Sequence, residues 1–114
     1  MGLTVHVTPA DPKAESLQFE TTIKANDVTL QKQQDRWTGA ISMAVGVRDK
    51  DGKELFHKAE TANLRFVQSS YDGIQQNGMT ISGQVPLKPG AEQLRIVVRD
   101  DTSGNIGSIT VPVR

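Results

Sequence analysis

Apolar side chains recur at every second position through most of this chain, and this spacing constrains the fold more than any other feature. Successive side chains of a β-strand point to opposite faces of the sheet, so a period of two is typical of strands with one buried face. Pro, Gly, Asn and Asp, which favour turns, separate the segments. The alternation is clearest in residues 3–8, 17–23, 37–47, 79–87, 94–99 and 106–113.

Seven or eight short strands in succession, with no convincing amphipathic helix between them, predict an all-β fold. We expect an immunoglobulin-like or fibronectin III-like sandwich of two antiparallel sheets, and a closed barrel is the competing architecture. The 114 residues match the size of one domain. We therefore assign residues 1–114 to a single sandwich, in which Met1 and Gly2 are candidates for residues added by cloning.

The pattern also predicts where some strands lie within the sheets. Residues 37–47 carry only small side chains on one face and mostly apolar ones on the other, which indicates a central strand. Residues 55–64 alternate less regularly, so we expect a bulge or an edge position there. Pro112 has no N–H to donate, which favours an edge position for the last strand.

Two polar segments and one change of parity complete the expectations about the backbone. We interpret residues 31–36 as a loop, with one helical turn as the alternative. Residues 65–78 are interpreted as a loop that could include a short strand. The apolar parity changes between Ile106 and Ile109, which predicts a bulge near Gly107.

Charge and cysteine content exclude several classes of function. Thirteen basic residues balance thirteen acidic ones, so no net field draws the chain to nucleic acid or to an anionic membrane. No apolar run approaches the length of a membrane span, and we expect no membrane insertion. The absence of cysteine excludes disulfides, thiolate metal sites and cysteine nucleophiles.

No motif of an enzyme appears in the sequence. The nucleophile elbow Gly-x-Ser-x-Gly, the phosphate-binding loop and the metalloprotease motif His-Glu-x-x-His are all missing. His6 and His57 lie on separate expected strands and are interpreted as surface or edge side chains rather than zinc ligands. We therefore expect a non-enzymatic protein with no catalytic residues and no cofactor.

Aspartates in two expected turns are the candidates for a metal site. Asp49, Asp51, Asp100 and Asp101 could bind calcium if the fold brought their loops together, because Ca²⁺ prefers carboxylate oxygens. The spacing from Asp49 onward does not fit a helix–loop–helix calcium motif. Turn formation by aspartate is the favoured interpretation, so we expect no metal.

Two groups of residues are candidates for binding a partner. Trp37 and Tyr71 could stack against a sugar, although the parity of Trp37 favours a place in or beside the core. The interaction surface would consist of Val97, flanked by Arg95 and Arg99, and of Ala44 on the small-residue face of residues 37–47. A sandwich can use such a face, its loops or its strand edges for binding.

The last third of the chain resembles a known bacterial domain. The motifs are VPLKPG at residues 85–90, LRIVVRD at 94–100, SGNIGS at 103–108 and VPV at 111–113. Together they resemble the C-terminal β-sandwich of bacterial VWFA-related proteins, which carry a von Willebrand factor A-type domain upstream. Glu92 stands where that family commonly has an aromatic residue. The resemblance implies an exported protein, periplasmic or extracellular, and it supplies no catalytic residue.

From these observations we predict a non-catalytic accessory domain of an exported bacterial protein. It would act in protein interaction or as a rigid spacer, and its partner would be another protein or a neighbouring domain of the same chain. A carbohydrate-binding module that uses Trp37 and Tyr71 is the alternative. Oligomeric state and strand order stay open at this level.

Overall fold

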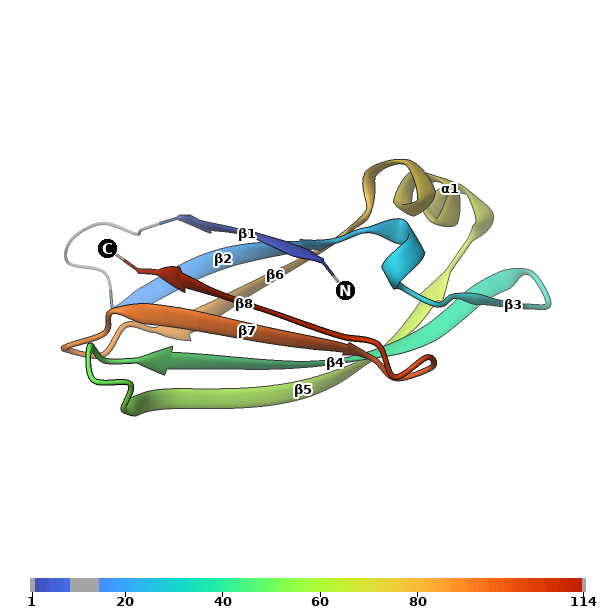
Figure 1. Cartoon of the computed structure of the whole chain (residues 1–114). Helices are drawn as coiled ribbons and strands as arrows, with labels where there is room; N and C mark the ends of the chain where they lie inside the picture. The colour runs from blue at the N-terminus through green and yellow to red at the C-terminus, as the bar shows by residue number, and fades with distance from the viewer. Residues whose placement is uncertain (1, 9–14, 114) are drawn as a thin grey trace.

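The computed structural model describes residues 2–8 and 15–113, and most of these residues belong to β-strands (Figure 1). A 3₁₀ turn, η1 (Ala25–Asp27), and a helix, α1 (Gln68–Asn77), interrupt the strands. No helix within these ranges is long and apolar enough to cross a membrane. The strands are β1 (Leu3–Thr8), β2 (Ser16–Ile23), β3 (Gln31–Gln33), β4 (Arg36–Arg48), β5 (Glu54–Phe66), β6 (Met79–Pro86), β7 (Gln93–Asp100) and β8 (Ile106–Pro112).

The strands form two antiparallel sheets that pack face to face. The small sheet has the order β1-β2-β6. In the large sheet β4 lies between β5 and β7, β8 pairs with β7, and the short β3 pairs with the first residues of β4. Along one side of the sandwich β1 contacts β8. The predicted immunoglobulin-like sandwich is confirmed, and the closed barrel is wrong.

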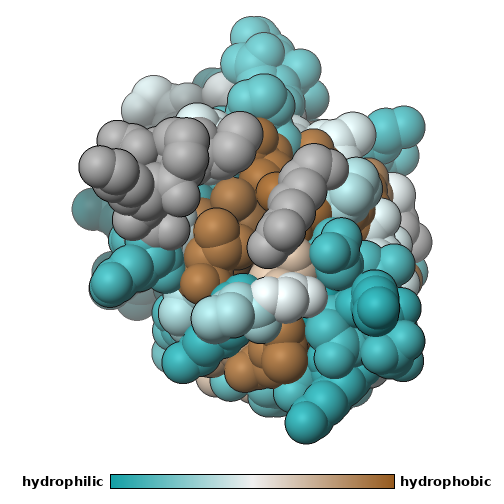
Figure 2. Space-filling view, turned by 90° about the vertical axis from the view of Figure 1, so that its left-hand side faces the viewer, coloured by the Kyte–Doolittle hydropathy of each residue, from teal (hydrophilic) through white to brown (hydrophobic). Residues whose placement is uncertain are grey.

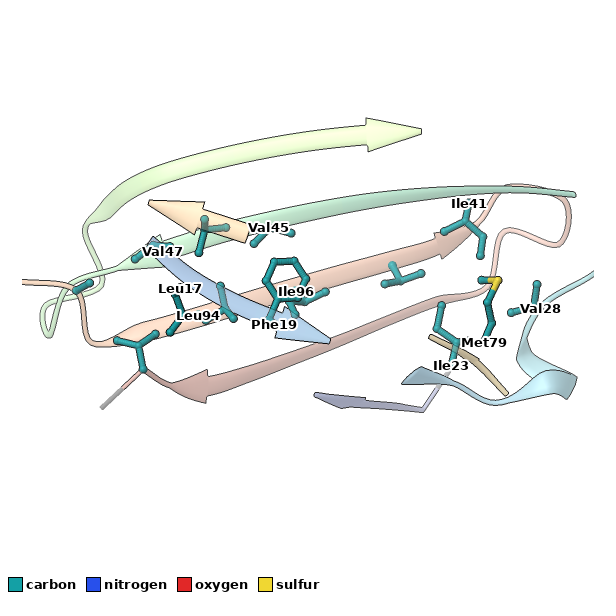
Figure 3. Packing of buried hydrophobic residues seen from close by; sticks show 14 of the residues in the cluster. Leu17, Phe19, Ile23, Val28, Ile41, Val45, Val47, Met79, Leu94 and Ile96 are labelled. Carbon is teal, nitrogen blue, oxygen red and sulfur yellow. The ribbon is translucent and has the colours of Figure 1, made fainter. Parts of the chain in front are cut away.

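Alternate side chains of both sheets point into one core between the layers. Phe19 of β2 and Ile96 of β7 point into its middle, and Ile23, Val28 and Met79 gather toward the end that carries α1 (Figure 3). At the opposite end, hydrophobic side chains lie between the more hydrophilic outer faces (Figure 2). Removal of this apolar surface from water is the main force that holds the two sheets together.

The sequence predictions about strand positions agree with the sheets. β4 is the central strand of the large sheet, with β5 on one side and β7 on the other. Among the described strands β5 pairs only with β4, so it is an edge strand, and its register shifts between Val47 and Arg48. Pro112 lies in β8, which is the opposite edge of the large sheet.

Residues 65–78 do not form the predicted loop. β5 continues to Phe66, and residues 68–77 form α1, which buries one side chain, Ile74, and has no side-chain cap at its start. A helix that buries so little and has no side-chain cap leaves neither an apolar period nor a capping signal in the sequence, which is why the helix was not predicted. Gly78 ends α1 with φ of 80°, a conformation that favours glycine, and donates its N–H to the Ile74 carbonyl at 2.8 Å.

Two further backbone predictions are wrong. Residues 31–33 form β3, which pairs with the start of β4 as a hairpin rather than a loop or a helical turn. No bulge exists at Gly107, because β8 pairs with β7 without a register shift. Ile106 faces outward with 57% of its surface exposed. The prediction of a bulge assumed that Ile106 faces the core like Ile109, but single exposed apolar residues are common on protein surfaces.

Candidate functional site

The residues of the predicted interaction surface, Ala44, Arg95, Val97 and Arg99, lie together on the outer face of the large sheet. Ala44 of β4 is directly opposite Val97 of β7 on one side and Ala59 of β5 on the other. Their side chains point away from the core, as the alternation predicts. We call this surface the large-sheet face, and its residues are Ala44, Gly46, Ala59 and Val97 at the centre with Arg48, Arg95 and Arg99 around them.

Short side chains at the centre of the large-sheet face leave two adjoining hollows. The first has a volume of about 310 Å³ and lies over Ala44 and Gly46, with Arg95 on its rim. The second has a volume of about 390 Å³ and extends from Ala44 past Val97 to Ile106. Ala44 and Val97 line both hollows, so they mark the centre of the surface. Such hollows can accept side chains of a protein partner.

A hydrogen-bonded network fixes one end of the large-sheet face. The Ser42 hydroxyl donates to the Asp101 carboxylate at 2.7 Å and lies 3.0 Å from the Thr61 hydroxyl. Arg99 places its Nε 3.9 Å from the same carboxylate. The contact of Ser42 with Asp101 has no signal in the sequence, because it depends on the pairing of β4 with β7.

The two candidate sugar-binding residues contact each other. The rings of Trp37 in β4 and Tyr71 in α1 stack with centroids 3.7 Å apart and planes 4° from parallel. Trp37 donates its Nε1 hydrogen to Oε1 of Gln68 at 3.0 Å, and Gln68 donates to Asp72 at 2.9 Å. Each ring therefore covers one face of the other, and the indole N–H is already bonded.

This stack modifies both expectations about the aromatic residues. Trp37 and Tyr71 are each half-buried, so neither is a core residue nor a fully exposed ring. The stack joins α1 to the start of β4, which gives it a structural role. One face of each ring at most is left for a ligand.

The two turns that carry the candidate calcium ligands, Asp49 with Asp51 and Asp100 with Asp101, are not brought together. The register of β4 with β7 pairs Arg48 with Gln93 and Ile41 with Asp100, so Asp49 and Asp100 lie at opposite ends of these strands. Asp49 accepts hydrogen bonds from the backbone N–H groups of Asp51 and Lys53, both at 2.9 Å. Among the described residues no group of three His, Cys, Asp or Glu side chains could hold a metal ion.

Asp100 is a buried carboxylate with a structural environment. Its Oδ2 accepts hydrogen bonds from the Thr29 N–H at 2.9 Å and the Ser103 hydroxyl at 2.8 Å, and Oδ1 accepts from the Thr102 N–H at 3.3 Å. Burial alone raises the pKa of Asp100, but these hydrogen bonds outweigh it and hold the pKa below its ordinary value. The carboxylate thus stays charged and ties residues 28–30 to the β7–β8 turn.

No family model matches the chain, and no curated protein matches it. Among solved structures, an endonuclease/exonuclease/phosphatase from Beutenbergia cavernae DSM 12333 aligns with 93% of this chain at 17% identity and a TM-score of 0.35. This chain covers 22% of that protein. A likeness of that size supports no inference about the fold or function of this chain.

Proposed function

We propose that this chain is a non-catalytic accessory domain that docks a protein partner, or a neighbouring domain, on the large-sheet face. The observation that carries the proposal is the pairing of Ala44 with Val97 at the centre of two adjoining hollows. Short side chains allow the backbone and side chains of a partner to approach closely. Arg95 and Arg99 flank this centre, and arginine is enriched in protein interfaces.

The proposed setting is an exported bacterial protein, periplasmic or extracellular. Its support is the resemblance of residues 85–113 to the C-terminal domain of VWFA-related proteins. In such a setting the partner would be a domain of the same polypeptide or another envelope protein. If the domain acts as a rigid spacer instead, no partner covers the large-sheet face and the face stays in contact with water.

The proposal is tested by comparing the wild-type chain with Val97→Asp and His6→Asp. Val97→Asp adds a charge at the centre of the large-sheet face, whereas His6→Asp is a matched change at an exposed position of β1. Each chain is studied by light scattering at several concentrations and by capture of envelope proteins. We expect an assembly or a captured partner that His6→Asp retains and Val97→Asp loses. Equal behaviour of all three chains would contradict docking on this face.

Carbohydrate binding is the second candidate function, and the meeting of Trp37 with Tyr71 favours it. The stacked pair carries Gln68 and Asp72 beside it, and such polar groups can bond to sugar hydroxyls. Titration with soluble glycans while Trp37 fluorescence is recorded tests this function, because Trp37 is the single tryptophan of the chain. A saturable change that Tyr71→Ala abolishes would support sugar binding, and an unchanged signal would contradict it.

A further inference from the structure

The two sheets differ in width, and β5 extends beyond the small sheet. Val45 of β4 is paired with Lys58 of β5, so the two side chains lie on the same face of the large sheet. Val45 is only 3% exposed, whereas the side chains of Lys58 and Glu60 are 46% and 58% exposed. The inner face of β5 is therefore open to water at the place where a fourth strand of the small sheet would cover it.

The strand of the small sheet next to this place is β6, and one of its edges is open. Among the described strands β6 pairs only with β2. The Leu87 N–H donates to the Glu15 carbonyl at 2.7 Å, and in an antiparallel pair every second residue then points its backbone groups toward the neighbouring strand. Thr80, Ser82 and Gln84 therefore direct their N–H and C=O groups to the open edge.

Pro86 closes this row of backbone groups. It shares the parity of Ser82 and Gln84, so its nitrogen faces the open edge, where the absence of an N–H breaks no bond to β2. The available row from Thr80 to Gln84 matches the length of a short strand of about five residues.

Beside this edge lies a small hollow with an apolar floor. Its volume is about 100 Å³, and the charged side chains of Lys58 and Glu60 form its rim. Phe19 reaches into it because its ring lies over Gly83, which has no side chain. The apolar residues of the floor are Phe19, Met43, Val45, Ile81 and Val85.

We propose that the β6 edge binds one extended peptide segment, which becomes the fourth strand of the small sheet. The peptide would bond to Thr80, Ser82 and Gln84, and its inward side chains would lie over the apolar floor and the inner face of β5. Nζ of Lys58 lies 2.9 Å from Oε1 of Glu60. The two residues are two positions apart in β5, so both side chains are on its inner face. A carboxylate facing Lys58 and an ammonium or guanidinium facing Glu60, also two residues apart, complement them.

Twofold pairing of β6 with the β6 of a second copy does not fit this edge. Pairing of β6 with β6 about a twofold axis would make one continuous sheet and place both large sheets on the same side of it. Each β5, which lies one strand beyond its own β6, would then overlap the β4 of the other copy. A peptide that is one strand wide avoids this clash, so the sheet widths select a single strand.

The probe is a synthetic peptide of about seven residues, with threonines facing out and valines, one Glu and one Lys facing in. Amide hydrogen exchange of the full chain is measured with and without it. We expect slower exchange at Ser82, Thr80 and Gln84 and no change at Ile81 and Gly83, which already face β2. The proposal would be overturned by slower exchange along another edge strand or by no slowing at all. It would also be overturned if raising the concentration of the chain without peptide slowed exchange at the same residues.

Two sets of variants make the result specific. Ser82→Pro removes one N–H from the open edge and should weaken peptide binding about tenfold, while Ser82→Ala, which keeps the N–H, should not. The exchanged pair Lys58→Glu with Glu60→Lys, at exposed positions, should reverse the preference between peptides whose Glu and Lys are interchanged. An unchanged preference would overturn the assigned orientation over β5. Val97→Asp lies on the other surface and should leave peptide binding unchanged, which separates this test from that of the proposed function.

Discussion

Asp100 shows how one residue can connect distant parts of this sandwich. Its carboxylate accepts the Thr29 N–H across a sequence separation of 71 residues and also holds Ser103 and Thr102 in the β7–β8 turn. The carboxylate is completely buried, and an uncompensated charge there would be strongly destabilising. Its hydrogen bonds therefore make Asp100 a contributor to stability rather than a free acidic group.

The lowered pKa of Asp100 predicts a loss of stability in acid. Because the folded state holds the proton less tightly than the unfolded state, the contribution of Asp100 to stability is complete above the ordinary aspartate pKa of 3.8 and disappears as pH falls through the lower pKa of the folded state. Urea unfolding at about pH 7 and then from about pH 5 down to about pH 2 should show this decline in the wild type. Asp100→Asn should lower stability at neutral pH by about 1 to 3 kcal/mol and flatten the decline. Asp51→Asn also removes a carboxylate, but at an exposed turn position, and should leave the stability at neutral pH close to that of the wild type.

Gly83 provides a second prediction for a single residue. A Cβ at this position would collide with the ring of Phe19, so Gly83→Ala should lower the free energy of unfolding by about 1 to 3 kcal/mol. Gly73 in α1 has no neighbour within 4 Å of a new Cβ, so Gly73→Ala should raise the free energy of unfolding by about 0.5 to 1 kcal/mol. Denaturant titration of both variants checks the opposite signs, and a stable Gly83→Ala would contradict the contact with Phe19.

Among the elements, α1 depends most on the tertiary structure. It is polar, lacks a side-chain cap and buries only Ile74, and ten-residue helices of this kind are marginal in isolation. The stack of Tyr71 on Trp37 and the bond from Trp37 to Gln68 attach it to β4. These contacts explain why a segment without a helical sequence pattern forms a helix here.

Removal of the Tyr71 ring should therefore loosen α1. We expect Tyr71→Ala to lower the free energy of unfolding by about 1 to 2 kcal/mol, to shift the Trp37 emission to longer wavelength and to speed amide exchange in residues 68–77. Tyr71→Phe keeps the ring and should stay close to the wild type in all three measurements. Unchanged exchange in α1 after Tyr71→Ala would show that the stack on Trp37 is not needed to hold the helix, and that Ile74 and the bond from Trp37 to Gln68 are sufficient.

The whole molecule is elongated, with extents of 48 × 27 × 19 Å, and α1 lies at one end of it. The same hydrophobic cluster nevertheless includes Ile74 of α1 and Leu94 of β7. A continuous core of this kind favours cooperative unfolding of a domain of this size. The end that carries α1 should not unfold on its own.

Two probes at different places can test this cooperativity. Trp37 fluorescence reports on the α1 end, and far-ultraviolet circular dichroism reports on the strands throughout the chain. We expect both to give the same midpoint in urea, because one core joins the two ends. An earlier transition in fluorescence would mean that the α1 end unfolds separately.

The sequence by itself determined the sandwich class, the position of most strands, the central place of β4 and the outward direction of Ala44 and Val97. These properties depend on local alternation and on turn residues, which are visible in short stretches of chain. The tertiary structure decided which strands pair, the formation of α1 and β3, the stack of Trp37 on Tyr71, the separation of Asp49 from Asp100 and the open edge of β6. Each of these depends on contacts between residues far apart in the chain, whose burial and pairing exist only once both sheets have formed.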